Sequence, residues 1–259
     1  MKIGIVGAGN MGGAIARGLA KENVAIVACS PNRHQELDAL KAEFPAVEVS
    51  TDNAAAIKGT DAVIVAVKPW LLDEVMAPLA AKIDWSKQML ISVVAGASLE
   101  HLASFAGGKP AAVFQLIPNT AIAVGQSMTF IAAQGASDSQ LQAVVGLFGR
   151  LGDTMVVDEA TMPACMALAS CGIAYVMRYV HAAMEGGVEL GVKPDQAKDI
   201  MLQTMQGAVT LLRATGNHPE VEIDKVTTPG GYTIKGLNAM EAAGFTNSVI
   251  EGLKASVKK

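Results

Sequence analysis

Short apolar runs bounded by turn residues recur through the first part of the chain. Five of them, with little polar alternation, cover residues 2–6, 24–29, 62–67, 89–94 and 111–117. Strands of a parallel sheet that helices cover on both faces have this uniformly apolar character. The stretches between them, such as residues 11–21 and 71–80, show helical spacing. The pattern therefore predicts a series of β-α-β units.

A last apolar run at residues 127–133 and a helical pattern around residues 138–150 complete this series. We interpret residues 1–157 as an α/β Rossmann-type domain built on an open doubly wound sheet. Such sheets bind ligands at the carboxyl ends of their strands. A site is therefore expected in the turns that follow the strands.

Beyond residue 157 strand-like runs disappear. Long helical patterns cover residues 160–190 and 194–215, and the second is closed by Gly216. We therefore predict an all-helical domain over residues 158–259. About 100 residues make a small domain, so burial against a second copy of the chain, as a homodimer, is expected.

Composition narrows the classes of function. The chain has 259 residues, of which 51% are apolar, enough to bury a substantial core. Its 20 basic and 24 acidic residues give a formal charge of −4 without a basic run, so nucleic acid is not an expected partner. Cys29, Cys165 and Cys171 lack metal-ligand spacing and sit among apolar neighbours, which predicts buried thiols in a reducing cytoplasm.

Residues 160–177 carry no charge and are nearly long enough to span a membrane. They are rich in alanine, serine, cysteine and glycine and include Pro163. We interpret them as a buried helix, in a subunit interface, and expect no membrane association.

A glycine motif, Gly7-Ala-Gly9-Asn-Met-Gly12, follows the first predicted strand and opens a predicted helix. Gly7 permits a tight turn, Gly9 lets the backbone approach a pyrophosphate, and Gly12 allows close helix–strand packing. Glycine turns are common, but this placement inside a β-α-β unit favours dinucleotide binding.

The end of the second predicted strand bears on the choice of cofactor. NAD-binding domains usually place an acidic residue there, to bind the ribose 2′-hydroxyl. Here the sequence is Cys29-Ser-Pro-Asn-Arg33, in which Ser30, Asn32 and Arg33 would surround a 2′-phosphate. Arg33 alone fits an exposed helix start equally well. The missing acid and the arginine together favour NADPH, with NADH as the alternative.

Two more turns follow predicted strands, one at Val67-Lys68-Pro69 and one at Pro118-Asn119. Either borders the nicotinamide end or is an ordinary proline loop. The four histidines adjoin no glycine turn, although reduction of a ketone normally needs a positioned proton donor. A cyclic imine that arrives protonated needs no strong acid, and Tyr232 and Lys68 remain candidate donors.

A late turn, residues 226–233 with the sequence VTTPGGYT, precedes a short helix predicted to begin at Thr233. Its glycine amides and its threonine hydroxyls form a cradle suited to a carboxylate at a helix N-terminus. The alternative is a capping threonine after a Pro-Gly turn.

These motifs resemble the pyrroline-5-carboxylate reductases, which reduce 1-pyrroline-5-carboxylate to L-proline with NADPH. The resemblance runs from end to end. It rests on DKVTTPGGYTIKGLNAME and, in order, on IGIVGAGNMGGAIARGL, AVKP, SVVAGASLEHL and PNTAIAVG.

The resemblance implies a Rossmann domain and a helical domain that interlocks with a partner in a homodimer, with dimers often assembled into larger rings. It assigns the substrate to Thr228, Gly231, Tyr232 and Thr233, of which Thr233 would be the catalytic contact, bonding the ring nitrogen or the carboxylate. It assigns the cofactor to the following residues: Gly7, Gly9, Asn10, Met11, Gly12, Ser30, Arg33, Asn53, Val67, Lys68 and Asn119.

Three positions depart from the family pattern. Residues 170–175 read SCGIAY where GSGPAY is frequent, Lys225 replaces a frequent asparagine, and Tyr232 fills the variable position of the turn. A β-hydroxyacid dehydrogenase, the nearest rival, commonly carries a Lys-x-x-x-Asn pair that this chain lacks. A noncatalytic NADP-binding sensor would need the cofactor motif but not the VTTPGGYT turn.

Overall fold

The structure, a computed structural model, describes residues 1–257. The chain divides into two compact units, one over Met1–Ser170 and one from Cys171 onward. Met162 lies beyond residue 157 yet packs in a core of the first unit. The domain boundary at residue 157 stays a prediction, because these contacts do not show which segments fold independently.

An eight-stranded sheet forms the centre of the first unit, with the strand order β3-β2-β1-β4-β5-β6-β7-β8. Its first six strands pair in parallel, which confirms the Rossmann-type fold predicted from the uniformly apolar runs. The strands are β1 Lys2–Val6, β2 Ala25–Cys29, β3 Glu48–Ser50, β4 Ala62–Val65, β5 Met89–Ser92, β6 Val113–Ile117, β7 Ser127–Gln134 and β8 Gly152–Val156.

The sequence pattern missed β3 and β8 and did not give the direction of β7. Both missed strands lie at the edges of the sheet and are half-exposed, so neither shows the continuous apolar run of a central strand. β7 runs antiparallel to β6, and β8 runs parallel to β7.

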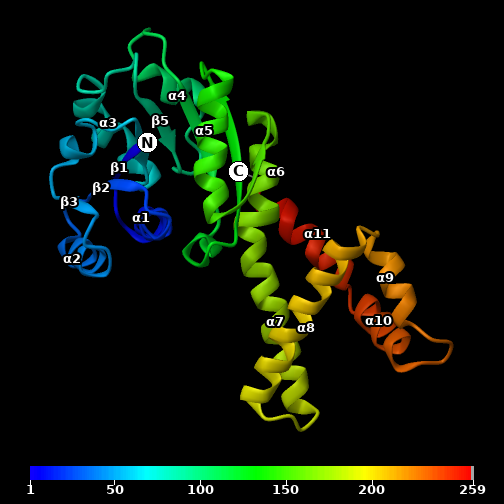
Figure 1. The fold of residues 1–259 in the computed structure, drawn as a ribbon. Coiled ribbons are helices and arrows are strands. Elements are labelled where there is room, and N and C mark those ends of the chain that lie inside the picture. Colours follow the sequence, from blue (N-terminus) through cyan, green and yellow to red (C-terminus); the bar gives the residue numbers. More distant parts are fainter. Residues whose placement is uncertain (258–259) are drawn as a thin grey trace. The chain divides into compact units, whose positions relative to one another are not determined.

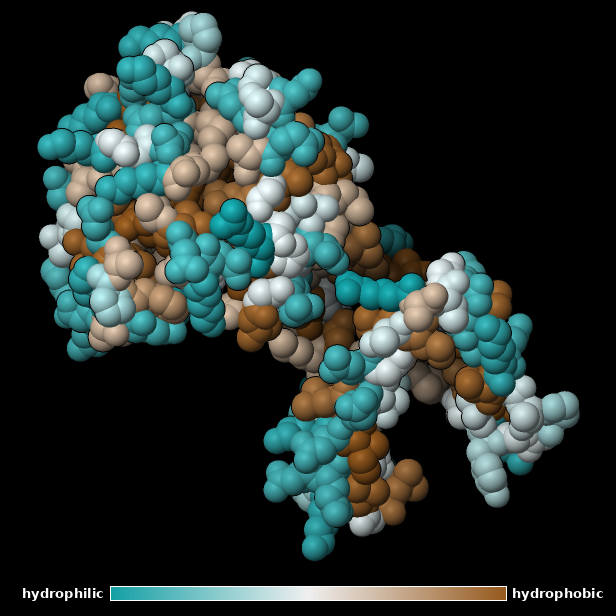
Figure 2. All heavy atoms as spheres, in the orientation of Figure 1, coloured by the Kyte–Doolittle hydropathy of each residue, from teal (hydrophilic) through white to brown (hydrophobic). Residues whose placement is uncertain are grey.

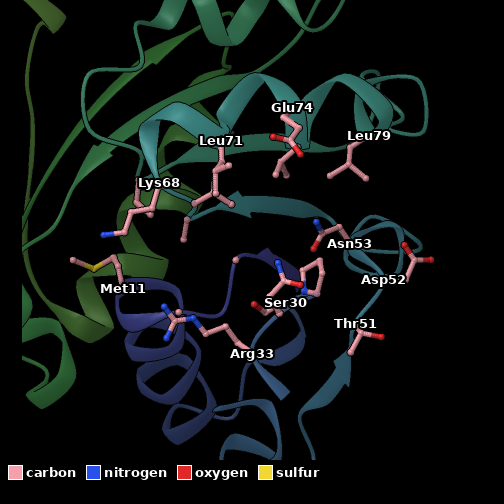
Figure 3. A pocket seen from close by; sticks show the side chains of 18 of the residues that line it. Met11, Ser30, Arg33, Thr51, Asp52, Asn53, Lys68, Leu71, Glu74 and Leu79 are labelled. Atoms are coloured by element: carbon pink, nitrogen blue, oxygen red, sulfur yellow. The ribbon is translucent and has the colours of Figure 1, made fainter. Parts of the chain in front are cut away.

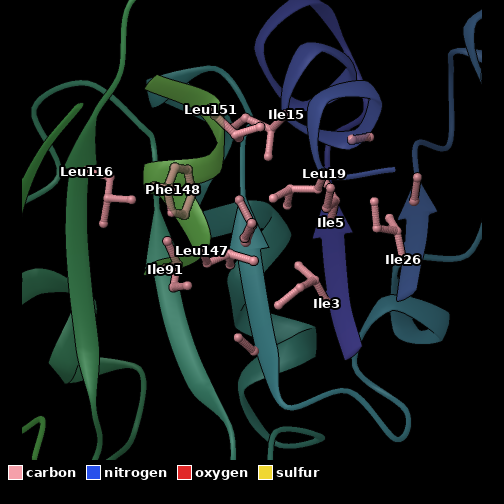
Figure 4. Packing of buried hydrophobic residues seen from close by; sticks show 14 of the residues in the cluster. Ile3, Ile5, Ile15, Leu19, Ile26, Ile91, Leu116, Leu147, Phe148 and Leu151 are labelled. Atoms are coloured by element: carbon pink, nitrogen blue, oxygen red, sulfur yellow. The ribbon is translucent and has the colours of Figure 1, made fainter. Parts of the chain in front are cut away.

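Two apolar cores cover the faces of the sheet. One contains residues of α1, α2 and α5, and Figure 4 shows Leu19 of α1 beside Ile5 of β1 and Ile15 of α1 beside Leu151. The opposite core contains residues of α3, α4 and α6. These helices are α1 Asn10–Lys21, α2 His34–Glu43, α3 Leu72–Ala80, α4 Leu99–Ser104, α5 Asp138–Phe148 and α6 Met162–Cys165.

Short helical turns follow or precede several of these elements. Five are 3₁₀ turns, and η6 is a π-helix that leads into the second unit. Within it, the Ser170 hydroxyl donates a 2.7 Å hydrogen bond to the Pro118 carbonyl after β6. The turns are η1 Asn53–Ala56, η2 Pro69–Leu71, η3 Thr120–Val124, η4 Gly149–Leu151, η5 Glu159–Thr161 and η6 Met166–Cys171.

The described part of the second unit is helical, as predicted (Figure 1). Helices α7 and α8 pack together at Gly187 and Ala197, where a Cβ built on Gly187 would lie 3.4 Å from the Ala197 side chain. The Tyr175 hydroxyl of α7 donates to the Gly252 carbonyl of α11 at 3.3 Å. The helices are α7 Gly172–Glu189, α8 Pro194–Thr215, α9 Pro219–Val226, α10 Tyr232–Ala242 and α11 Phe245–Ala255.

Residues 160–177 are helical, as expected, but the single chain does not bury them, so their burial in a subunit interface stays a prediction. Within the described residues, the helical stretch Glu159–Glu189 is long and apolar enough to cross a membrane, yet only 17% of its most apolar window is buried. Leu168 and Met177 are 65% and 61% exposed. Figure 2 shows hydrophobic side chains on the surface of the helical second unit. Cys29 is buried, whereas Cys165 and Cys171 are only half-buried.

Candidate functional site

The three motif glycines are required for different reasons. Gly7 has a φ of +96°, a conformation that favours glycine. At Gly12, a Cβ would lie 2.2 Å from the Gly7 carbonyl oxygen, so this glycine permits the close packing predicted for it. At Gly9, a Cβ would meet no atom within 4 Å. Packing therefore does not explain Gly9, and its backbone is open to the approach of a ligand.

Helix α1 begins immediately after Gly9, which is its N-cap. No side chain caps the helix, and no acidic residue lies in its first turn. The first backbone amides of a helix have no partner inside it, and its N-terminus carries a partial positive charge. This end of α1 can therefore hold an anion.

A cleft of about 750 Å³ opens beside this helix terminus. In Figure 3, Ser30 and Arg33 lie on one side of it, and Leu71, Glu74 and Leu79 lie on the other. Its lining brings together most of the predicted cofactor residues: Gly7, Gly9, Asn10, Met11, Ser30, Arg33, Asn53, Val67 and Lys68.

Ser30 and Asn53 present polar atoms without protein partners to this cleft. Ser30 is only 6% exposed, and within residues 1–257 its hydroxyl makes no hydrogen bond. The Asn53 Oδ1 atom is buried and also has no partner. Buried polar groups normally find a partner, so the Asn53 Oδ1 atom fits a bound polar ligand.

Arg33 is the N-cap residue of α2 and lines the cleft. Its Nη1 atom donates a 2.7 Å hydrogen bond to Glu36 Oε1, in an exposed ion pair. This hydrogen bond is the main cause that lowers the pKa of Glu36 below its ordinary value. The guanidinium therefore lies at the cleft with a carboxylate already attached.

Two predicted cofactor residues, Gly12 and Asn119, do not line the cleft. Gly12 is buried under Gly7. The Asn119 Oδ1 atom accepts a 3.0 Å hydrogen bond from the Ala121 amide and caps η3, while the Asn119 backbone N–H donates to the Ser127 hydroxyl. The cofactor role of both residues stays a prediction.

The structure adds cleft residues that the sequence reasoning did not select. Asp52 follows β3, and Glu74 and Lys82 come from α3 and the residues after it. No carboxylate follows β2 directly, as the sequence indicated, but β3 and α3 bring two carboxylates to the same cleft. The alternating Val-Glu-Val-Ser at residues 47–50 was the available signal for a strand before Asp52.

The VTTPGGYT turn has a defined backbone in the second unit. The Gly231 amide donates a 2.9 Å hydrogen bond to the Thr228 carbonyl. Pro229 and Gly230 occupy the two central positions, and Gly230 has a φ of +72°, as a type II turn requires. At Gly231 a Cβ would lie 2.4 Å from the Thr228 Oγ1 atom, so the second glycine permits a close approach.

Helix α10 begins at Tyr232, one residue earlier than predicted. Its N-cap is Gly231, and no side chain caps it, so Thr233 is not the capping threonine of the alternative interpretation. Within the described residues the hydroxyls of Thr228 and Thr233 make no hydrogen bond, and Tyr232 is 94% exposed. The Gly231 amide is thus used inside the turn, and the turn offers the Thr228 and Thr233 hydroxyls together with the first amides of α10.

None of the four histidines, all within the described residues, lines the cleft. His101 contacts Asp73 at 2.6 Å, His181 pairs with Glu185, and His218 caps α9 through Nδ1. His34 begins α2. Among residues 1–257, the cleft is therefore lined by no imidazole that could act as a proton donor.

Two family models match the chain. Residues 159–259 match the model described as pyrroline-5-carboxylate reductase dimerisation. Residues 2–96 match the model described as NADP oxidoreductase coenzyme F420-dependent. The second match covers the glycine motif and every residue that lines the cleft.

Several relatives match this chain over its whole length. A pyrroline-5-carboxylate reductase of Synechocystis is 34% identical over 100% of this chain and 97% of its own. The pyrroline-5-carboxylate reductase 1 of Dictyostelium discoideum is 37% identical over 99% of this chain, which spans only 49% of that protein. The 1-pyrroline-5-carboxylate reductase structure from Streptococcus pyogenes is 30% identical, with a TM-score of 0.87 over 99% of this chain and 96% of its own. The chain therefore belongs to the pyrroline-5-carboxylate reductase family of oxidoreductases.

Proposed function

We propose that this protein reduces 1-pyrroline-5-carboxylate to L-proline with NADPH, the last step of proline biosynthesis. The observation that carries the proposal is the open glycine loop at Gly9, which no packing requires and which faces the 750 Å³ cleft. The names of the relatives support the substrate.

The cleft fits a dinucleotide phosphate by its donor set. The uncapped N-terminus of α1 would hold the pyrophosphate. Ser30 and Arg33 would hold the 2′-phosphate, and Asn53 would bind a polar group of the adenosine half with its unpartnered Oδ1. When bound, the nicotinamide supplies a hydride to the imine carbon of the substrate.

The turn would hold the substrate by its carboxylate. The amides at the start of α10 point out of the helix unpaired, and the Thr233 hydroxyl is free to bond the ring nitrogen or the carboxylate. A cyclic iminium already carries its proton, so its reduction needs no histidine in the cleft.

We propose a homodimer built through residues 159–259, in a cytoplasmic protein. The match to a dimerisation model and the exposed apolar surface of Glu159–Glu189 support the dimer. A dimer interface would cover this surface, so no membrane is needed to explain it. A ring of dimers is the larger assembly that the family resemblance implies.

The direct test follows NADPH absorbance in the presence of 1-pyrroline-5-carboxylate and the purified protein. We expect consumption of NADPH that depends on the imine and produces L-proline, with a lower kcat/KM for NADH. Proline formation without any preference for NADPH would refute the cofactor assignment. Failure to turn over the imine with either cofactor would refute the function.

Thr233→Val tests the substrate half separately. The replacement is nearly isosteric and keeps the backbone amide, so it removes one hydrogen bond to a charged group, worth about 1.5–3 kcal/mol. We expect kcat/KM for the imine to fall by roughly 10- to 100-fold and NADPH binding to be unchanged. Full activity, with unchanged inhibition by proline-like carboxylates, would show that the turn is not the substrate site.

A further inference from the structure

The charge partner of Arg33 lies outside the cleft that Arg33 lines. Glu36 stands in the first turn of α2, three residues after Arg33, and does not contribute to the lining. Its Oε1 atom accepts from Nη1 of Arg33 at 2.7 Å, and the two side chains are 43% and 50% exposed. The carboxylate therefore neutralises, from the helix side, a cation that faces the cleft.

Arg33 nevertheless keeps donors for a ligand. A guanidinium has five N–H donors in a planar fork. Within residues 1–257, Glu36 is the only hydrogen-bond partner of this guanidinium and is bound through Nη1, so Nε and Nη2 have no protein partner. A phosphate can therefore bind Arg33 while Glu36 stays attached, but it meets a neutralised pair instead of a full positive charge.

The electrostatic surroundings make this neutralisation matter. A phosphomonoester carries a charge of about −1.5 to −2 at neutral pH, and its binding depends on charge-assisted hydrogen bonds. The β2–α2 loop, residues 30–33, contributes Arg33 as its one basic residue. Asp52 adds a carboxylate to the same cleft. Whatever competes for the Arg33 guanidinium therefore weakens the recognition of a 2′-phosphate.

We propose that Glu36 is a specificity-determining residue that limits 2′-phosphate recognition by holding Arg33. This inference rests on the proposed NADPH function and deepens it. It says that Glu36 reduces the extent to which the protein prefers NADPH over NADH. Glu36 touches no ligand itself and acts through Arg33 as a positioning residue. A purely structural role would instead be the stabilisation of the α2 N-terminus by an acidic first-turn residue.

The test uses binding of two nucleotides, adenosine 2′,5′-bisphosphate and adenosine 5′-monophosphate, measured by isothermal titration calorimetry on the intact protein. The variants are Glu36→Gln, Arg33→Ala and the double variant. We expect Glu36→Gln to bind the bisphosphate about threefold more tightly, in line with the modest energy of an exposed ion pair. Its affinity for the monophosphate should be unchanged, and the gain should vanish in the Arg33→Ala background.

Glu43→Gln is the matched control. Glu43 lies at the other end of the same helix and makes a similar exposed ion pair, with Arg17 at 2.9 Å, away from the cleft. Glu43→Gln changes the net charge of the protein by the same amount as Glu36→Gln. If Glu43→Gln also bound the bisphosphate more tightly, the effect would come from overall charge and the proposal would be overturned.

Three other outcomes would also overturn it. No gain in Glu36→Gln, with the parent still preferring the bisphosphate, would refute the role of Glu36 and leave the NADPH assignment intact. An equal gain in the Arg33→Ala background would mean that Glu36 repels the phosphate directly. A parent that binds both nucleotides equally would refute the NADPH preference itself and this inference with it.

Discussion

At Gly9 the fold would accept a side chain, and we propose that a ligand is what requires a glycine there. Its neighbours Gly7 and Gly12 are fixed by a positive φ and by a close contact with the Gly7 carbonyl, respectively. The space around the Gly9 Cβ position is open. A methyl group at this position would meet no protein atom and would occupy only the space where we propose that a phosphate approaches the backbone.

Gly9→Ala should therefore separate folding from cofactor binding. We expect the melting temperature to stay within about 2 °C of the parent, because the new methyl group meets no protein atom. NADPH affinity, measured by fluorescence titration, should fall by at least tenfold. Gly12→Ala is the contrasting variant, since its Cβ would lie 2.2 Å from a carbonyl oxygen and should destabilise the fold. Unchanged NADPH affinity in Gly9→Ala would remove the glycine loop from the site.

Arg33 lines the cleft, and the loop that carries it has no acid to bind a free 2′-hydroxyl. Arg33→Ala should raise KM for NADPH by roughly tenfold, as expected for the loss of a partly exposed charged contact. KM for NADH should change little, because NADH has no phosphate at this position. Steady-state kinetics with both cofactors checks this, and equal losses with both would contradict the assignment.

At the scale of elements, β2 places a thiol in the interior, next to a residue that lines the cleft. Cys29 is fully buried at the end of this strand, directly before Ser30. Burial raises the pKa of the Cys29 thiol from 9.0 to about 11, because the thiolate would lose its hydration. Because the thiol binds its proton more tightly in the folded protein, its contribution to the free energy of unfolding is fully present below pH 9, the pKa of the unfolded chain. This contribution is lost as the pH rises from about 9 to about 11.

The reactivity of Cys29 provides the measurement. In a Cys165→Ser/Cys171→Ser background, alkylation by iodoacetamide at pH 8 should be at least about a hundredfold slower in the folded protein than in guanidinium. A rise of two pKa units lowers the thiolate fraction by that factor, and burial slows access further. Similar rates in the folded and unfolded protein would mean that the end of β2 opens readily.

At the scale of the whole molecule, the apolar surface of Glu159–Glu189 needs a partner. Leu168, Val176 and Met177 are each about half-exposed or more in the single chain, and exposed apolar surface of this kind marks an interaction site. The dimerisation model covers the same segment. A second copy of the chain is therefore the partner that we propose for it.

Sedimentation at low micromolar concentration should show a dimer and no folded, active monomer. Met177→Glu should shift this equilibrium toward the monomer, because it places a charge on a surface that the dimer would bury. Gln142→Glu, on an exposed position of α5, adds the same charge outside the segment and should leave the dimer intact. A folded and active parent monomer would refute an obligate dimer.

The sequence by itself determined the central strands, the glycine motif and the helical second part. Strands such as β1 and β4 are buried on both faces, so their apolar runs are set locally by what each face must bury. The roles of Gly7 and Gly12 likewise follow from short-range geometry between a strand and the next helix. These features need few contacts between distant residues.

Only the tertiary structure decided the edges of the sheet and the composition of the cleft. β3 and β8 are strands because of the neighbour they pair with, and their exposed residues leave little local signal. Asp52 and Glu74 are far apart in sequence and reach the cleft only because β3 and α3 are placed around it. The i to i+3 spacing of Arg33 and Glu36 is enough to predict that the two side chains can pair on a helix. Whether this pair can affect ligand binding depends on which side chain lines the cleft, and only the folded chain shows that it is Arg33.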